Sequence, residues 1–245
     1  MNNLITYENE GNLGNTIQTL GLAHLISPSK GIPYYQIKSS KLKDGLLICN
    51  GWFGSYPEVE NINAIFCGVH LTRPNESIIN WLRTSTTIIG ARDPATADYL
   101  NNINIRSEFI GCGSLMFPYY DGPRSGDVSV DFNGPGVRYT HRISPSISWA
   151  ERWVRAREMI EIYKTASVVY TNRLHVALPC LAMGTPVYVE DNADKGRFSI
   201  LDAIGIKYNQ IQKDINTSWL RDKYKSFLES QIGAELNLVD PIMPC

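Results

Sequence analysis

Short apolar runs alternate with longer amphipathic segments through residues 1–111 of the chain. Apolar runs of this length are typical of buried strands, and apolar residues at helical spacing between them predict helices that cover the strands. Asp93 and Pro94 form a start signal for one helix, with Asp93 as its N-cap. The strands are predicted at 4–7, 33–38, 45–50, 64–69, 86–91 and 107–111, and the helices at 15–26, 76–83 and 94–101. This alternation predicts an α/β unit built on a parallel sheet.

A second α/β unit follows a stretch that is rich in turn-forming residues. Residues 120–136 concentrate Gly, Pro, Asp and Ser and carry little helical periodicity. Beyond them, strands are predicted at 137–141, 166–171 and 186–190, and helices at 148–163, 173–183 and 215–230. The sequence therefore predicts an N-terminal lobe over residues 1–122, a linker over 123–136, and a C-terminal lobe over 137–245 that includes the last helix.

The charge balance narrows the classes of partner. Lys and Arg number 23 against 24 Asp and Glu, and no block of like charge stands out, which argues against a nucleic-acid-binding protein. The start of the chain lacks the pattern of a signal peptide, and no long apolar run could cross a membrane. We expect a cytoplasmic protein with at most peripheral contact at the inner membrane face. The sequence leaves its oligomeric state open.

The cysteines give no sign of a metal centre or a disulfide framework. They number five, lie far apart, and contain no C-x-x-C pair. Reduced, buried thiols are the expectation for Cys49, Cys67, Cys112, Cys180 and Cys245. No structural metal is expected.

Arg173 and His175 are polar residues inside an otherwise apolar segment, and both fall where a strand ends and a helix begins. Asn172 is the predicted N-cap of that helix, and Gly184 its end. A cation is disfavoured at a helix N-terminus, so Arg173 needs an explanation. An anionic ligand would supply one, because it would accept hydrogen bonds from the guanidinium and from the amides of the first turn, at Leu174 and His175. The alternative is an Arg173 paired with a carboxylate and a His175 packed in the core.

Arg92 repeats this arrangement at the end of the predicted strand 86–91, directly before Asp93 and Pro94. Two arginines at two strand ends can meet across a cleft, and together they would hold a small ligand that carries two acidic groups. A simple ion pair of Arg92 with Asp93 or Asp98 is the alternative.

These residues resemble the polysaccharide pyruvyl transferase family. Its late T-[SN]-R-L-H segment stands here as TNRLHVALPCLAMGTPV, and its R-D-x-x-[ST] segment as ARDPAT. NLGNTI, NGWF, EFIGCGSL and THRIS are similar to further family segments, so that the resemblance covers most of residues 11–205. Asn15 stands where the family usually has an aspartate, which leaves an acidic role at this position open.

The resemblance implies two Rossmann-like lobes with parallel sheets in an arrangement like that of GT-B glycosyltransferases, here in a shortened form. It implies that phosphoenolpyruvate is the donor, that no cofactor is needed, and that a pyruvyl group passes to two hydroxyls of a sugar as a cyclic ketal. Arg92 and Arg173 would hold the donor's phosphate and carboxylate, with Asn172 and Leu174 beside it. His175 would be the acid/base residue.

The acceptor side is expected among polar and aromatic residues that follow the strands of the N-terminal lobe. The candidates are Asn12, Asn15, Asn50, Trp52, His70 and Arg73, with His141 from the second unit. For Trp52 a place in the core is an equal alternative, and His141 is more simply structural. The sequence does not identify the acceptor sugar, nor whether a lipid carries it.

Two other functions stay open at this point. A sugar-nucleotide glycosyltransferase on the same fold would need a ribose-binding carboxylate, and Glu190 and Asp191 stand in a suitable place. A non-catalytic carbohydrate-binding relative is the third possibility. The presence of Arg92, Arg173 and His175 together argues against that third function.

Overall fold

The structure is a computed structural model of the 245-residue chain. It describes residues 2–8, 10–28, 30–37, 46–54, 63–191, 194–241 and 243. Residue 38 of the second predicted strand, residue 45 of the third, and Cys245 lie outside the described residues. Cys49, Cys67, Cys112 and Cys180 are buried and free, as expected.

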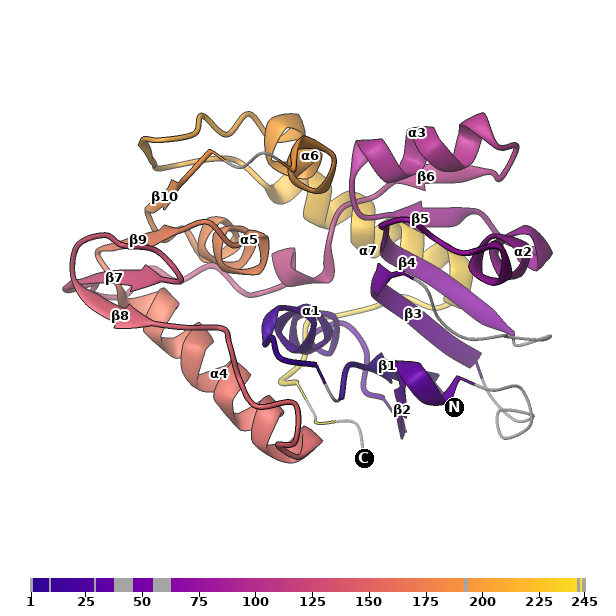
Figure 1. Cartoon of the computed structure of the whole chain (residues 1–245), viewed down its shortest axis with the longest axis horizontal. Coiled ribbons are helices and arrows are strands. Elements are labelled where there is room, and N and C mark those ends of the chain that lie inside the picture. The colour runs from indigo at the N-terminus through magenta and orange to yellow at the C-terminus, as the bar shows by residue number, and fades with distance from the viewer. Residues whose placement is uncertain are drawn as a thin grey trace.

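The N-terminal part of the chain forms a parallel sheet of six strands (Figure 1). The strand order is β2-β1-β3-β4-β5-β6, and all neighbours pair in parallel. The strands are β1 (Asn2–Thr6), β2 (Lys30–Pro33), β3 (Leu46–Phe53), β4 (Ala64–Leu71), β5 (Ile89–Ala91) and β6 (Ser107–Phe109). In such an order the chain adds β2 on one side of β1 and then adds β3 and the later strands on the other side. α/β proteins bind ligands at the carboxyl ends of the strands at this switch point between β1 and β3.

The second sheet repeats the order of the first with five strands. Its order is β11-β10-β9-β7-β8, so that its switch point lies between β7 and β9. Only β11 runs antiparallel to its neighbour. The strands are β7 (Asp127–Val130), β8 (Val137–Tyr139), β9 (Val168–Thr171), β10 (Val187–Val189) and β11 (Ile211–Gln212). Two sheets of parallel character with interleaved helices confirm the predicted Rossmann-like α/β fold.

Side-chain caps mark the starts of several helices. Asp93, Asn75 and Ser148 each accept a hydrogen bond from a backbone N–H of the first turn, and the predicted N-cap role of Asp93 is confirmed. The α-helices are α1 (Gly14–Leu22), α2 (Glu76–Thr84), α3 (Pro94–Asn102), α4 (Trp149–Thr165), α5 (Leu174–Met183), α6 (Lys195–Ala203) and α7 (Ser218–Ile232). Two 3₁₀ turns, η1 (Tyr34–Gln36) and η3 (Gly113–Leu115), complete the elements used below.

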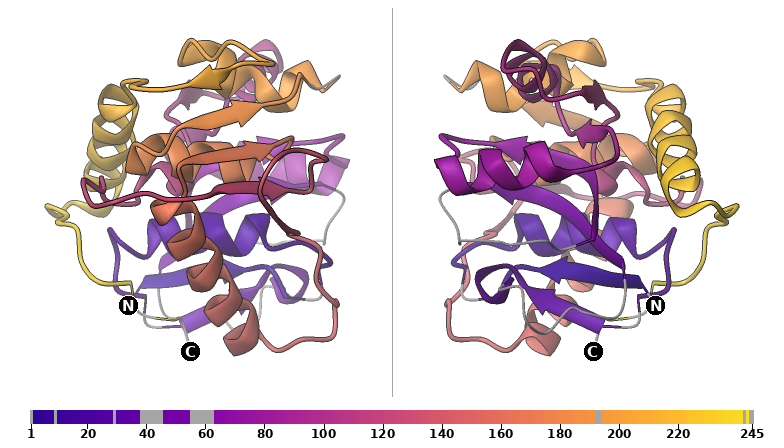
Figure 2. Two further views of the ribbon diagram at one scale, coloured as in Figure 1. Left: turned by 90° about the vertical axis from the view of Figure 1, so that its left-hand side faces the viewer. Right: turned by 90° about the vertical axis from the view of Figure 1, so that its right-hand side faces the viewer.

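The structure differs from the predicted domain organisation in two places. The predicted linker 123–136 contains β7, an inner strand of the second sheet, because a strand of four residues between Gly- and Pro-rich turns leaves too short an apolar run to be recognised. The last helix, α7, packs against β4 of the first sheet, where the Tyr224 hydroxyl donates to the Cys67 carbonyl oxygen over 3.3 Å. Both views in Figure 2 show α7, in yellow, on the outside of the molecule.

Helix α1 joins the two halves of the molecule. All its residues are buried, and it packs against α4, α5 and η3. A methyl group at Gly21 would lie 2.2 Å from the Gly113 carbonyl oxygen, so the approach of α1 to η3 requires glycine at that position. A single core cluster runs from Leu4 through α1 to Val187 and Val189 of the second sheet. The two sheets therefore share one continuous core.

A buried arginine strengthens the same junction. Arg152 of α4 is fully buried, and its guanidinium donates to the Glu10 carbonyl oxygen (2.6 Å) in the loop after β1. It also donates to the carbonyl oxygens of Ser144, Pro145 and Ile147 in the loop before α4. Loops from the two halves are thus held by one charged side chain whose buried donors find carbonyl partners.

Candidate functional site

A cavity of about 410 Å³ lies at the carboxyl ends of the first sheet's strands, facing the N-termini of α5 and α6. We call it the central cavity. The loop after β1 lines it with Glu10, Gly11 and Asn12, and α1 adds Asn15. The remaining lining residues come from strand ends and from the second half of the chain: Trp52, His70, Thr72, Arg92, His175, Asp194 and Arg197. The cavity occupies the switch point between β1 and β3, where a ligand site is expected.

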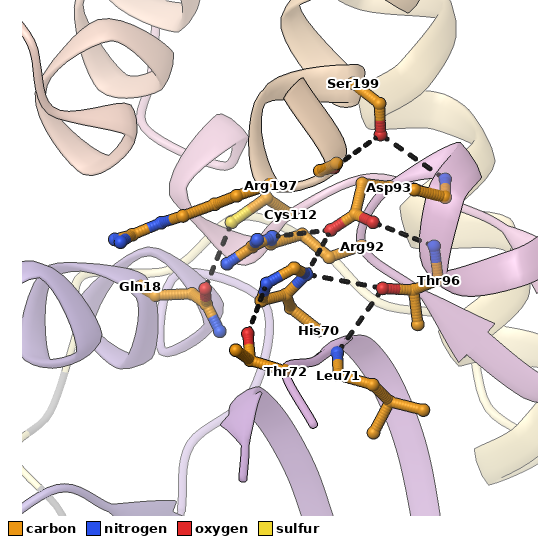
Figure 3. A network of polar contacts seen from close by, with 12 residues as sticks. Gln18, His70, Leu71, Thr72, Arg92, Asp93, Thr96, Cys112, Arg197 and Ser199 are labelled. Carbon is orange, nitrogen blue, oxygen red and sulfur yellow. Dashed lines mark hydrogen bonds and ion pairs between the residues drawn. The ribbon is translucent and has the colours of Figure 1, made fainter. Parts of the chain in front are cut away.

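Arg92 follows β5 and is held in place from several sides. Only 1% of it is exposed, and its backbone N–H donates to the Val69 carbonyl oxygen (2.8 Å). Its Nε donates to Oδ2 of Asp93 over 3.1 Å (Figure 3). Its Nη2 is buried and has no hydrogen-bond partner among the described residues. A buried donor without a partner indicates a place for a ligand or water.

Asp93 fixes the protonation of His70. Burial alone would raise the pKa of Asp93, but hydrogen bonding to His70 and the charge of Arg92 outweigh it, and the pKa is lowered. The ionised carboxylate accepts a hydrogen bond from His70, whose Nδ1 lies 2.8 Å from Oδ2 (Figure 3). Burial and Arg92 lower the pKa of His70, so its ring is neutral. Its Nε2 is then an acceptor, and the Thr72 hydroxyl donates to it over 2.9 Å.

His175 lies in the first turn of α5 and is 3% exposed. A methyl group at Gly14 would lie 2.8 Å from its Nδ1, so the first residue of α1 must be glycine for the ring to fit. Its Nε2 is buried and has no partner among the described residues. Burial lowers the pKa of His175 well below its usual value, and the charges of Arg92 and Arg197 lower it further. The ring is therefore neutral at neutral pH.

Arg173 does not line the central cavity. Its Nε donates to Oδ2 of Asp131, after β7, over 3.0 Å. Burial would raise the pKa of Asp131, but hydrogen bonds from Thr140 and the His141 N–H, together with the charge of Arg173, lower it. Arg173 lines a neighbouring cavity of about 270 Å³, which we call the arginine cavity; its lining is Asp131, Arg142, Asn172, Arg173, Arg197 and Phe198. Arg92 and Arg173 therefore line different cavities and do not meet directly as predicted. A third arginine lines both cavities.

That third arginine is Arg197, which lines both cavities and which the sequence analysis missed. It lies in the first turn of α6, where its backbone N–H donates to Oδ1 of the N-cap Asp194 over 3.1 Å. Burial lowers the pKa of Arg197, and the charge of Arg92 and then that of Arg173 also lower it. Asp194, three residues ahead, is an N-cap signal that could have revealed α6. Figure 3 shows the Arg197 side chain extended past Arg92 and Cys112.

The other predicted residues divide into two groups. Asn12, Asn15, Trp52 and His70 line the central cavity, whereas Asn172 lines the arginine cavity. Asn172 is not the N-cap of α5; Arg173 occupies that position in an extended conformation. Arg73 lines a third cavity, described below. The remaining three candidates line neither of the first two cavities: Asn50, His141 and Leu174.

Those three residues are buried elsewhere. Asn50 is fully buried, and its carbonyl oxygen accepts from the Tyr7 hydroxyl (2.5 Å). The His141 ring lies beside the Tyr163 hydroxyl at 2.5 Å, and burial lowers the pKa of His141 to about 4. Leu174 packs in the core. For His141 the structure supports the structural alternative.

The structure also locates a carboxylate near position 15. The Asn15 amide donates to Oε2 of Glu10 over 2.8 Å, and Glu10 lines the central cavity. Burial raises the pKa of Glu10, and the hydrogen bond from Asn15 partly offsets this rise. A carboxyl group therefore lies beside Asn15 in the central cavity.

Within the described part of the chain, no three His, Cys, Asp or Glu side chains converge as metal ligands would. The same part of the chain holds no helix with the length and apolar character that crossing a membrane requires.

Comparison with known proteins shows the family of the chain. A sequence model of the family described as polysaccharide pyruvyl transferase matches residues 15–194, which include Asn15, Arg92 and the R-L-H segment. The chain belongs to the polysaccharide pyruvyl transferase family. A family of transferases supports an enzymatic role that involves a sugar or polysaccharide acceptor. Arg197 lies just beyond the matched region of this transferase.

A solved structure supports the fold alone. The chain is similar to the crystal structure of an uncharacterised protein from Klebsiella pneumoniae, with 16% sequence identity and a TM-score of 0.52. The likeness covers 84% of this chain and 90% of that one. No curated protein matches the chain.

Proposed function

We propose that the protein transfers the pyruvyl group of phosphoenolpyruvate to two hydroxyls of a sugar in a polysaccharide or its precursor, forming a cyclic ketal and releasing phosphate. The observation that carries the proposal is one cavity that holds Arg92, Arg197 and an uncharged, unpartnered His175. Buried cations that repel one another across a cavity are stabilised by a bound anion. The family membership supports the pyruvyl transfer.

The donor carries a phosphate and a carboxylate, and three arginines are available to bind them. Arg92 offers its unpartnered Nη2 in the central cavity, and Arg173 keeps the rest of its guanidinium for the arginine cavity while its Nε binds Asp131. Arg197 lies between the two cavities. In this proposal one acidic group of the donor binds near Arg92 and the other toward Arg173, with Arg197 in contact with both.

His175 acts as the acid in this proposal. It is neutral at neutral pH, and a bound anion beside it raises its pKa, so that it takes up a proton when the donor binds. It then delivers this proton to the methylene carbon of the donor, which makes carbon 2 electron-deficient. One sugar hydroxyl adds to carbon 2, and a second hydroxyl displaces the phosphate. One of the two hydroxyl protons leaves with the phosphate and the other restores His175, and the chemistry requires no redox cofactor.

In this proposal His70 acts as the base for one acceptor hydroxyl and passes the proton that it takes up to the departing phosphate. Asp93 holds the proton on its Nδ1, which leaves Nε2 free to accept a proton once the Thr72 hydroxyl gives way to the sugar. The same carboxylate binds Arg92, so one buried Asp93 orients both the anion-binding arginine and the base. Glu190 and Asp191, which a nucleotide-sugar donor would require, line neither cavity.

Replacement of His175 tests the proposal. His175→Gln should lower phosphate release from phosphoenolpyruvate, measured with polysaccharide-derived acceptors, by about a hundred- to ten-thousandfold. Its melting temperature should stay close to that of the wild type. His24→Gln is the matched control, because His24 packs against Phe117 away from the cavities. Near wild-type turnover in His175→Gln would show that this histidine is not the acid.

Binding separates this function from glycosyl transfer. Phosphoenolpyruvate should raise the melting temperature of the wild type, whereas UDP- and GDP-sugars should not. A shift with a nucleotide sugar alone would favour the glycosyltransferase. No shift with any donor and no phosphate release would favour a non-catalytic carbohydrate-binding protein.

A further inference from the structure

A second cavity adjoins the central one, and the proposed reaction does not use it. We call it the side cavity; its volume is about 420 Å³. It shares four residues with the central cavity: His70, Thr72, Asp194 and Arg197. The proposed base and one anion-binding arginine thus stand on the boundary between the two spaces. A ligand that reaches His70 from the side cavity also reaches the central cavity.

The lining of the side cavity suits a sugar ring better than an anion. Tyr99 of α3 is 42% exposed, and with Leu71 and Pro74 it offers apolar and aromatic surface for the C–H faces of a ring. Thr72 and Asp194 offer oxygens for hydroxyl groups. Two of the eleven lining residues of the side cavity are arginines, Arg73 and Arg197, whereas three of the six lining residues of the arginine cavity are arginines. A mixed apolar and polar lining of this size is typical of a site for an uncharged organic ligand.

The loop between β4 and α2, which forms one wall of the side cavity, contains a strained residue. Arg73 has a φ of 47°, in the left-handed region that a side chain with a Cβ adopts at a cost of roughly 1–2 kcal/mol. Asn75, two residues on, caps α2 through Oδ1, which accepts from the Ile78 N–H over 3.0 Å. Strained backbone concentrates where a loop shape serves a ligand. The loop therefore has a defined shape at the cavity wall, as expected of a loop that contacts a ligand.

We propose that the side cavity binds the sugar unit next to the one that receives the pyruvyl group. The inference rests on the proposed function. The terminal sugar presents its hydroxyls to His70 and His175 in the central cavity, and the glycosidic bond passes the shared wall. The preceding sugar then stacks on Tyr99. The acceptor is accordingly an oligosaccharide with at least two ordered sugar units, and a lone monosaccharide fills only part of its site.

Kinetics with acceptors of two lengths test this inference. Nitrophenyl monosaccharides of glucose, galactose, mannose and their N-acetylated amino sugars are compared with disaccharides that end in the same sugar. For the sugar that is used, the disaccharide should have a KM about tenfold lower in the wild type, and Tyr99→Ala should remove most of this difference. Tyr99→Phe should preserve it, because the ring remains. The effect should fall on the acceptor KM rather than on the KM for phosphoenolpyruvate.

A neighbouring substitution supplies the control. Asp98→Ala changes an exposed residue of the same helix that does not line the side cavity, and it should keep the preference for the disaccharide. Equal KM values for both lengths in the wild type would overturn the inference. A Tyr99→Ala variant that keeps the full preference for the disaccharide would overturn it as well.

Failure of the proposed function gives a different result. In that case no acceptor of either length releases phosphate from phosphoenolpyruvate. Saturation-transfer NMR with the same disaccharides then tests, without turnover, whether the side cavity binds the non-terminal sugar. Signals from the non-terminal sugar that disappear in Tyr99→Ala support the inference, and signals that persist in this variant, or are absent from the wild type, contradict it.

Discussion

Each of the two sheets carries an arginine–carboxylate pair at its strand ends, and the two pairs are held together differently. In each sheet an arginine follows a strand beside a carboxylate: Arg92 with Asp93 in the first sheet, and Arg173 with Asp131 in the second. Arg92 and Asp93 are adjacent in sequence, and their side chains are 2% and 0% exposed. Arg173 and Asp131 come from different strands, and their side chains are 26% and 10% exposed.

This difference separates a rigid binding group from an adjustable one. Asp93 is at once the N-cap of α3, the partner of Arg92 and the partner of His70, so no member of the group can move alone. Arg173 has a single carboxylate partner among the described residues, and its guanidinium borders a cavity. The Arg92–Asp93 pair is therefore rigid, whereas the Arg173–Asp131 pair has room to adjust.

Replacement of the two arginines should produce the largest difference in stability between the two pairs. Arg92→Met leaves a buried carboxylate without its cation, so the free energy of unfolding should fall by about 3–5 kcal/mol. Arg173→Met removes a partly exposed pair and should cost at most about 1 kcal/mol. Urea denaturation of both variants measures the difference.

Activity gives a second view of the same pair. Both variants should raise the KM for phosphoenolpyruvate. Arg92→Lys retains the charge but not the fork of donors, and should recover stability better than activity. Equal losses of stability in Arg92→Met and Arg173→Met would remove the distinction between a rigid and an adjustable pair.

Each half of the molecule also holds a buried histidine near its arginine–carboxylate pair, and acid should affect the two histidines differently. Burial lowers the pKa of His141 from 6.5 to about 4, so the unfolded chain binds its proton first as the pH falls. The stability that neutral His141 contributes is complete above pH 6.5 and is lost between pH 6.5 and 4, by about 3 kcal/mol. Urea denaturation of the wild type at several pH values should show this fall.

His141→Gln is the informative variant for this loss. Glutamine cannot take up a proton, so the fall in stability between pH 6.5 and 4 should become shallower. His70 has the carboxylate of Asp93 beside it, which opposes the lowering of its pKa. His70→Gln should therefore change the acid slope less. An unchanged slope in His141→Gln would contradict burial as its cause.

The smallest substitution considered adds one methyl group at Gly14, where α1 contacts the His175 ring. Gly14→Ala would place a methyl group 2.8 Å from Nδ1 of His175 and displace the ring. The kcat should fall by up to about a hundredfold, because a small misplacement of a reacting group has effects of this size. Gly11→Ala is the control, since its methyl group would lie 3.6 Å from the Ile143 carbonyl oxygen, an ordinary contact. Wild-type kcat in Gly14→Ala would mean that the His175 ring tolerates a shift.

Local signals made part of the site predictable from sequence. Asp93 and Pro94 announce a helix start, and Gly184 ends α5 in the left-handed conformation, with a φ of 75°, as expected. Arg92 and His175 were located because each stands at a strand–helix junction, and the structure brings them to one cavity. All of these features depend on residues within a few positions of one another.

Long-range features were missed for the opposite reason. The partner of Arg173 is Asp131, which lies 42 positions away, and its strand β7 is too short to show alternation. Asn172 looks like an N-cap by residue type, yet the Thr171 hydroxyl already accepts from the Arg173 N–H (2.9 Å) and the helix begins at Leu174. Arg197 was missed because its helix was not recognised, although Asp194 caps it.

The hydrogen bonds from Arg152 to backbone carbonyl oxygens limit the relative motion of the two halves of the molecule. Pulling the two halves apart would strip a buried guanidinium of its Glu10 partner and open the core shared through α1, at a cost of several kcal/mol. The two halves of the molecule are thus held in a fixed arrangement, and we expect no hinge motion between them. In the proposed reaction, donor and acceptor would therefore enter through the openings of the cavities without a separation of the two halves.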